Sequence, residues 1–151
     1  MITIDEFKKK QSETSRLIGL DLGSKRIGVS ICDEKQSIAT PLMTLNKASA
    51  DILIKDLKMI IKENNIKGVI IGYPINMDGT LGRSAQSVTD VSKNIDKALD
   101  IDVCLWDERL STVGAFNLSS QLDINVSKRE KNIDQNAAAF ILQGAIDFLN
   151  N

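Results

Sequence analysis

The chain has 151 residues, of which 42% are hydrophobic, a size and composition that suit a single globular domain. Its 19 basic and 20 acidic residues leave a formal net charge of −1, so nucleic-acid binding would need a local basic patch. The absence of histidine excludes imidazole bases and histidine-bound zinc, and two cysteines are too few for a four-thiolate site.

The first sixteen residues, MITIDEFKKKQSETSR, lack the apolar run of a signal peptide, and no stretch approaches 18 consecutive apolar residues. We therefore expect a cytoplasmic protein without a membrane partner. Residues 1–16 are expected to form a polar N-terminal extension, either a tail or a short helix, before a single domain at residues 17–151. Cys32 and Cys104 lie in apolar runs, which favours buried thiols in a reducing compartment.

The predicted elements alternate between strands and helices after an all-strand start. Strands are predicted at 17–22, 27–31, 37–42, 67–74 and 101–108, and helices at 48–65, 83–99, 110–118 and 133–149. The order is β-β-β-α-β-α-β followed by C-terminal helices. It predicts an α/β fold with a mixed sheet, in which three antiparallel strands come first and helical crossovers add the others.

Asp21 interrupts the first apolar strand, where an unpaired carboxylate is costly. Because side chains alternate along a strand, Leu17, Gly19 and Asp21 share one face, and the small Gly19 leaves room for another group to approach. A second interpretation stays open. Asp21 could begin the turn that follows and accept hydrogen bonds from the backbone amides of Ser24 or Lys25.

Two adjacent acids, Asp107 and Glu108, end the last predicted strand in the stretch LWDERLST. Alternation sends them to opposite faces, with Glu108 in phase with Cys104 and Trp106. The sequence does not say which of these faces carries a site. Acids that precede a helix are also explained by the helix dipole.

Asp134 heads the apolar stripe of the last predicted helix. The stripe consists of Ala137, Ala138, Ile141, Leu142, Ala145 and Leu149. Asp134 is therefore expected to point where the core-facing residues point, although an N-terminal capping role would also explain it. Acids that each break an apolar pattern suit a core only if they converge on a cation. Carboxylates without nitrogen or sulfur ligands favour Mg²⁺ or Mn²⁺, which bind substrate phosphates.

Four stretches resemble, in order and spacing, the motifs of the YqgF family of the RNase H-like superfamily, whose relatives include RuvC-type Holliday junction resolvases. They are GLDLGSKRIGVS, VIIGYPINMDGTLGRSAQSV, DERLST and IDQNAAAFILQ. The resemblance covers residues 17–149 and implies an RNase H-like fold. It implies that Asp21, Glu108 and Asp134 are the catalytic, metal-binding acids of a hydrolase, a two-metal-ion nuclease. Two Mg²⁺ or Mn²⁺ ions are then expected with substrate.

The departures from the family pattern do not touch the acids. The start is longer than in relatives, Arg83-Ser84 replaces a pair that contains proline, and residues 121–131 match only loosely. Basic residues in or beside the motif loops are expected to contact substrate phosphates, although each could also be an ordinary solvated side chain. They are Lys25, Arg26, Arg83, Arg109, Lys128 and Arg129.

The resemblance leaves two substrates open. One is structured RNA, in 5′-end maturation of the 16S ribosomal RNA precursor, and the other is branched DNA, in the resolution of four-way junctions. The first is preferred because symmetric cutting of a junction needs a dimer, and no dimer seam is evident; a monomer or a homodimer is possible. A non-catalytic nucleic-acid-binding module is a further alternative. ATPases of the actin and sugar-kinase type share the DxG turn but need two such domains, whereas this chain has the length of one.

Overall fold

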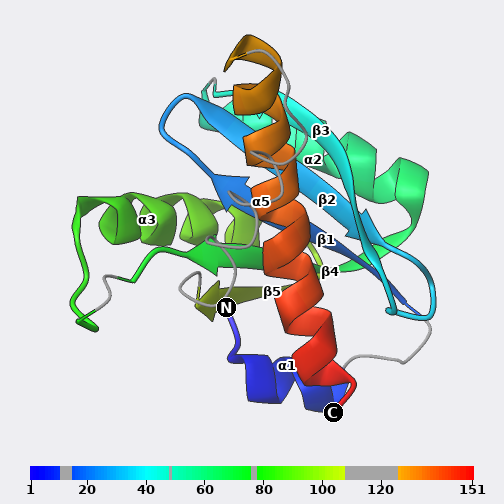
Figure 1. Ribbon diagram of the computed structural model, residues 1–151. Helices are drawn as coiled ribbons and strands as arrows, with labels where there is room; N and C mark the ends of the chain where they lie inside the picture. Colours follow the sequence, from blue (N-terminus) through cyan, green and yellow to red (C-terminus); the bar gives the residue numbers. More distant parts are fainter. Residues whose placement is uncertain (11–14, 48, 76–77, 108–125) are drawn as a thin grey trace.

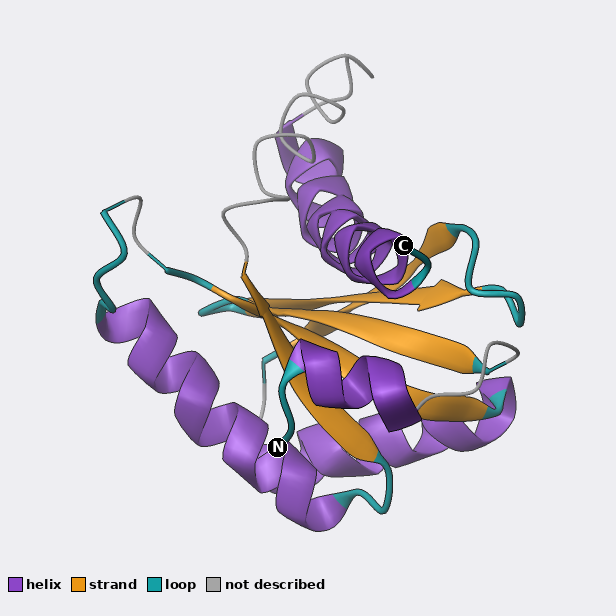
Figure 2. Ribbon diagram, turned by 90° about the horizontal axis from the view of Figure 1, so that it is seen from below, coloured by secondary structure: helices purple, strands orange, loops and turns teal. Residues whose placement is uncertain are grey.

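The computed structural model of the protein describes residues 1–10, 15–47, 49–75, 78–107 and 126–151, and for residues 126–133 and 135 it describes the backbone alone. The elements are α1 (Ile4–Lys10), β1 (Arg16–Leu22), β2 (Arg26–Cys32), β3 (Ala39–Asn46), α2 (Ala50–Asn64), β4 (Ile66–Tyr73), α3 (Arg83–Ala98), β5 (Asp102–Asp107) and α5 (Val126–Leu149). The strands form one sheet, with α5 on one face and with α2 and α3 on the other (Figure 1, Figure 2).

The strand order of the sheet is β3-β2-β1-β4-β5, which places the first strand at the centre. β1, β2 and β3 pair antiparallel, whereas β4 pairs with β1, and β5 with β4, in parallel. This is the mixed sheet that the element order predicts. Because parallel neighbours end at the same edge, the carboxyl ends of β1, β4 and β5 meet there, where ligands of open α/β sheets commonly bind.

Two predicted boundaries differ from the structure by more than two residues. The third strand, predicted at 37–42, runs from Ala39 to Asn46, because Met43 and Leu45 continue the pairing with Val29 and Ile27 of β2. The last helix begins at Val126 rather than at residue 133, since the preceding lysine, arginine and glutamate residues are good helix formers that an apolar pattern does not register. The helix predicted at 110–118 lies outside the described residues.

The sheet separates two apolar cores. The core under α2 and α3 includes Ile18, Leu20, Leu53, Leu57, Val69, Ile71, Val88, Ile95 and Val103. The core under α5 includes Phe7, Leu17, Cys32, Ile70, Cys104, Trp106, Ile141, Leu142 and Ile146. Both cysteines are free thiols in this second core, and burial raises the pKa of each, that of Cys104 to about 12. The prediction of buried thiols is confirmed.

The N-terminal segment packs against the sheet rather than extending into solvent. Ile2 pairs with Cys104 as a parallel bridge, and its backbone N–H donates to the carbonyl of Val103 at 3.0 Å. In α1, Phe7 is fully buried, and a ring carbon lies 2.5 Å from the position that a Cβ on Gly68 would occupy. The short helix therefore closes the β5 side of the α5 core. Among the described residues, no helix is both long and apolar enough to cross a membrane.

Candidate active site

Helix α5 touches the backbone of the sheet at Gly19. A Cβ at Gly19 would lie 2.5 Å from Ser30 Oγ, 2.7 Å from Leu142 Cβ and 2.9 Å from the carbonyl oxygen of Ala138. The hydroxyl of Ser30 donates to that carbonyl at 2.7 Å. The space that the sequence leaves at Gly19 is thus occupied by α5, which fixes the helix against β1 and β2.

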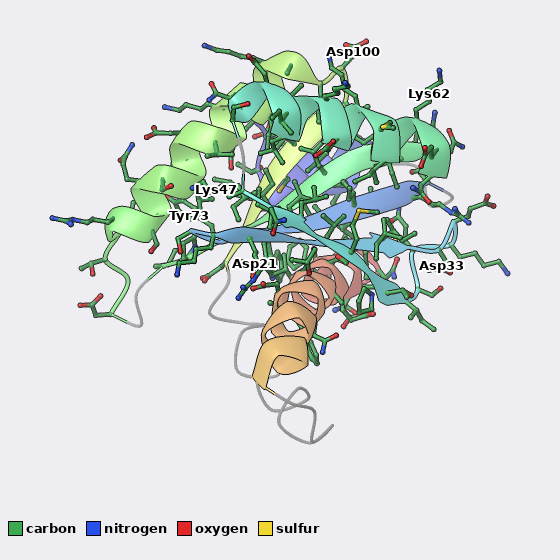
Figure 3. The ribbon with its side chains drawn as sticks, turned by 90° about the horizontal axis from the view of Figure 1, so that it is seen from above. Asp21, Asp33, Lys47, Lys62, Tyr73 and Asp100 are labelled. Atoms are coloured by element: carbon green, nitrogen blue, oxygen red, sulfur yellow. The ribbon has the colours of Figure 1, made fainter. Side chains whose placement is uncertain are left out.

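The strand register places Asp21 beneath the N-terminal half of this helix. Asp21 pairs with Gly28 of β2, and Gly28 lies between Arg26 and Ser30 on the same face of that strand. Both of those neighbours contact α5, at Asp134 and at Ala138 respectively. Asp21 therefore lies below the stretch of helix that begins with Asp134. Figure 3 shows Asp21 on the α5 side of the sheet, at the opposite end from Asp33.

Asp134 faces the sheet and forms an ion pair there. Arg26 Nε donates to Asp134 Oδ2 at 2.6 Å, and the side chains are 32% and 21% exposed. The carboxylate is thus half-buried and already beside one cation. Sequence reasoning assigned Arg26 to substrate phosphates and did not foresee this pair, although Arg26, Gly28 and Ser30 show the alternation that puts them on one face.

Asp21 and Arg26 lie on either side of the turn between β1 and β2. Its Gly23 N–H donates to the carbonyl of Asp21 at 3.1 Å, and a Cβ on Gly23 would lie 2.5 Å from the carbonyl oxygen of Arg26. Only glycine fits so tight a turn. Lys25 at its tip is exposed, at the same end of the sheet as Asp21.

Glu108 lies outside the described residues, but the residues before it show which face of the sheet each alternating set of β5 side chains occupies. Cys104 and Trp106 belong to the core under α5. Leu105 packs in the core under α2 and α3, and Asp107, two residues further along the strand, lies on the same face. The sequence predicts that Glu108 faces the same side of the sheet as Trp106. That side is the α5 face, on which Asp21 lies.

The other predicted phosphate contacts are spread over several elements. Arg83 is the first residue of α3 and is exposed. Lys128 and Arg129 lie in the first turns of α5, of which the backbone alone is described, and Arg109 lies outside the described residues. Lys25 and Arg26 are thus the predicted basic residues whose placement at the end of β1 is described.

A hard divalent cation fits the donor chemistry of this end of the sheet. The acids there offer carboxylate oxygens, the ligands that Mg²⁺ and Mn²⁺ prefer. Within the described residues, no three acidic or thiol side chains lie close enough to hold a metal. Glu108 is not among the described residues, so the predicted trio stays a prediction. An ion at Asp134 would share the carboxylate with Arg26 or displace it.

One further polar atom near β5 stands out. The indole Nε1 of Trp106 is buried without a hydrogen-bond acceptor among the residues that the structure describes. Trp106 is 7% exposed, and its ring packs on Phe148 with 5.9 Å between centroids. Sequence reasoning treated this residue only as a marker of strand phase.

Comparison with known proteins gives the family. The RuvX family, described as a Holliday junction resolvase, matches residues 15–148. The chain belongs to the RuvX family. It is 73% identical over 151 residues to a protein of Pelagibacter ubique named "Putative pre-16S rRNA nuclease", and all of both chains is covered. A protein of Rhodobacter capsulatus with the same name is 40% identical over 146 residues, with 97% of this chain and 92% of the relative covered.

Solved structures show the fold of this RuvX chain. T. thermophilus RuvC in complex with a Holliday junction substrate superposes with a TM-score of 0.60 at 10% identity, covering 91% of this chain and 97% of that one. A second Thermus thermophilus RuvC structure has a TM-score of 0.53 at 8% identity, covering 89% and 96%. With the strand order, this likeness confirms the RNase H-like fold implied by the sequence motifs.

Proposed function

We propose that this RuvX chain is a metal-dependent nuclease that hydrolyses phosphodiester bonds in structured nucleic acid. The observation that carries the proposal is the seating of α5 on Gly19 and Ser30, which brings Asp134 to the end of the sheet where Asp21 lies. Two acids 113 positions apart in the chain thereby come to one half-buried location, where carboxylates are costly unless cations accompany them.

Asp21, Asp134 and Glu108 are the residues that would hold Mg²⁺ or Mn²⁺. Such ions, when bound, activate a water molecule and stabilise the charge on the phosphate oxygens. The chain has no histidine, so an imidazole base does not compete with this explanation. Arg26 orients Asp134, and lies where its guanidinium can contact either that carboxylate or a substrate phosphate.

Structured RNA is the preferred substrate, in maturation of the 5′ end of the 16S ribosomal RNA precursor. The names of the relatives support this choice, at up to 73% identity over the whole chain. Lys25 and Arg83 are exposed and would bind the phosphate backbone of either RNA or DNA. Resolution of four-way DNA junctions is the second candidate, which the family description and the fold likeness to RuvC favour.

A cleavage assay tests both candidates with the full chain. The substrates are an RNA with the 5′ region of a 16S precursor, a four-way DNA junction and a linear DNA duplex, each titrated with Mg²⁺ and Mn²⁺. We expect metal-dependent cleavage of the RNA, and a loss of at least about 100-fold for Asp21→Asn and Asp134→Asn, which remove carboxylate ligands but keep the side-chain shape.

Asp100→Asn is the matched control, because Asp100 is exposed in the loop between α3 and β5, far from Asp21 (Figure 3). It should cleave like the wild type. Cleavage of the DNA junction alone would assign the second function. If Asp21→Asn cleaves as fast as the wild type, Asp21 has no part in the chemistry. Binding of all substrates without any cleavage would make the chain a nucleic-acid-binding module.

A further inference from the structure

A cavity of about 140 Å³ lies on the other face of the sheet, beside the turn that follows Asp21. It is lined by Leu22, Gly23, Ile27, Lys47, Ala50, Leu53, Ile54, Ser87, Val91, Asn94 and Ile95. Leu22 and Gly23 directly follow Asp21 in the chain, so the candidate active site and the cavity share the β1–β2 turn. Figure 3 shows Lys47 on the α2 and α3 side of the sheet, at the same end as Asp21.

The cavity has the size of a single six-membered ring. An apolar cavity of about 150 Å³ is known to accept benzene, so a space of 140 Å³ matches a pyrimidine ring more closely than the fused rings of a purine. Most of the wall is apolar, supplied by Leu22 and Ile27 of the sheet, by Leu53 and Ile54 of α2, and by Val91 and Ile95 of α3. A flat heterocycle would be buried there on both faces.

The rim of the cavity is polar. Ser87 and Asn94 of α3 are exposed, and so is Lys47, which follows β3. Within the described residues, none of these three side chains has a hydrogen-bonding partner. The amide of Asn94 offers both a donor and an acceptor, which suits the edge of a pyrimidine base, and Lys47 offers a cation for a phosphate.

Lys47 is tied to the turn that carries the basic residues of the site. Its backbone N–H donates to the carbonyl of Lys25 at 2.9 Å. Lys47 lines the cavity, and this bond holds the backbone of Lys25 next to it. A strand whose phosphates follow these lysines would pass from the acids on the α5 face to the cavity on the other face.

We propose that this cavity binds the base of an unpaired pyrimidine nucleotide in the substrate strand, with Lys47 on the adjacent phosphate. The inference rests on the proposed function, because it adds a base-binding position next to the cleavage site. It gives the chain a preference for a single-stranded pyrimidine flank, which contacts to the phosphate backbone alone would not produce.

A binding experiment without metal tests the inference on the full chain. The probes are two hairpin RNAs that differ only in a single-stranded flank of uridine or adenosine, together with uridine 5′-monophosphate and adenosine 5′-monophosphate. We expect the uridine flank to bind about tenfold more tightly, as a ring that fits an apolar pocket does over one that does not. Amide NMR shifts on adding uridine monophosphate should map to Lys47, Ala50 and Asn94.

Three variants separate the parts of the site. Ala50→Phe places a ring in the cavity from an exposed position at the start of α2 and should abolish the uridine preference. Asn94→Ala should reduce the preference without filling the space. Lys47→Gln should weaken both hairpins alike and lower the slope of log affinity against log salt by about 1. Lys62→Gln, with the same charge change at the far end of α2, is the control.

Each outcome decides the proposal. Equal binding of the two flanks, or a uridine preference that survives Ala50→Phe, overturns it. Binding of the free nucleotide without a flank preference would assign the cavity to a small molecule and also overturn it. The nuclease proposal fails separately: if no substrate is cleaved while Ala50→Phe still removes the uridine preference, the base-binding site stands alone.

Discussion

The two faces of the sheet carry their helices in different ways. On the α5 face, the helix touches the backbone at Gly19, and polar groups, namely Ser30, Arg26 and Asp134, join it to β2. On the other face, α2 and α3 rest on large aliphatic side chains and leave a cavity of about 140 Å³ at one end. Close backbone contact fixes the position of charged groups, whereas side-chain packing leaves space for a ligand.

The largest effect is expected where α5 meets the backbone. Gly19→Ala adds a Cβ within 3 Å of three atoms, two of which belong to the helix, and should lower the free energy of unfolding by about 3 kcal/mol. Cleavage should also be lost, since the helix that carries Asp134 must move. Urea unfolding and the RNA assay measure the two effects.

Gly79→Ala is the contrast for this change. A Cβ there meets nothing within 4 Å, but the φ angle of +88° strains any other residue. We expect a loss of about 1 kcal/mol from backbone strain alone. If Gly19→Ala costs no more than Gly79→Ala, then the close contact between α5 and β1 does not hold the helix.

The ion pair between Arg26 and Asp134 should compete with a divalent cation. Arg26→Gln removes the guanidinium from the carboxylate, so the affinity for Mn²⁺ should rise about tenfold, while Arg26→Lys, which keeps the charge, should change it less. Calorimetric titration of the full chain with Mn²⁺ measures this without any substrate. Unchanged Mn²⁺ affinity in Arg26→Gln would mean that Asp134 is not a ligand, and weaker binding would mean that Arg26 supports the ion.

The hydrogen bond from Ser30 should have a smaller effect. Ser30→Ala removes a buried bond of 2.7 Å to the carbonyl of Ala138, and should cost about 1 kcal/mol of unfolding free energy. Ser84→Ala, which removes an exposed hydroxyl from α3, is the control and should be neutral. Equal unfolding midpoints for the two variants would exclude a positioning role for Ser30.

The smallest effect concerns the far end of the sheet. Asp33 accepts hydrogen bonds from the backbone N–H groups of Ser37 at 2.7 Å and of Ile38 at 2.9 Å. These bonds lower the pKa of the Asp33 carboxyl, and the bond from Ile38 has the largest effect. A carboxyl whose pKa is lowered on folding adds stability at pH values above the ordinary pKa of an aspartate. This stability is lost as the pH falls through the pKa of the folded state.

The stability difference between the wild type and Asp33→Ala should therefore be constant near pH 7 and shrink below about pH 4. Urea unfolding at several pH values measures it. A difference that does not change with pH would show that the turn does not depend on the charge of Asp33. Cleavage should be unaffected, because Asp33 lies at the opposite end of the sheet from Asp21 (Figure 3).

The sequence by itself determined the order of the strands and of α2, α3 and α5, and the mixed sheet, because apolar periodicity records which side of each strand and helix is buried. It also singled out Asp21 and Asp134, since each acid breaks such a pattern. Their catalytic roles, and that of Glu108, stay predictions. The start of α5 at Val126 could not be predicted in this way, because charged helix formers carry no apolar signal.

Only the tertiary structure decided what lies next to what. The contact of Gly19 with α5, the pair of Arg26 with Asp134 and the shared face of Trp106 and Asp21 each join residues that are far apart in the chain. Alternation along a strand says that two faces differ, but not which one a distant helix covers. That choice depends on the strand order and on the crossing of α5, and these arise from packing over the whole sheet.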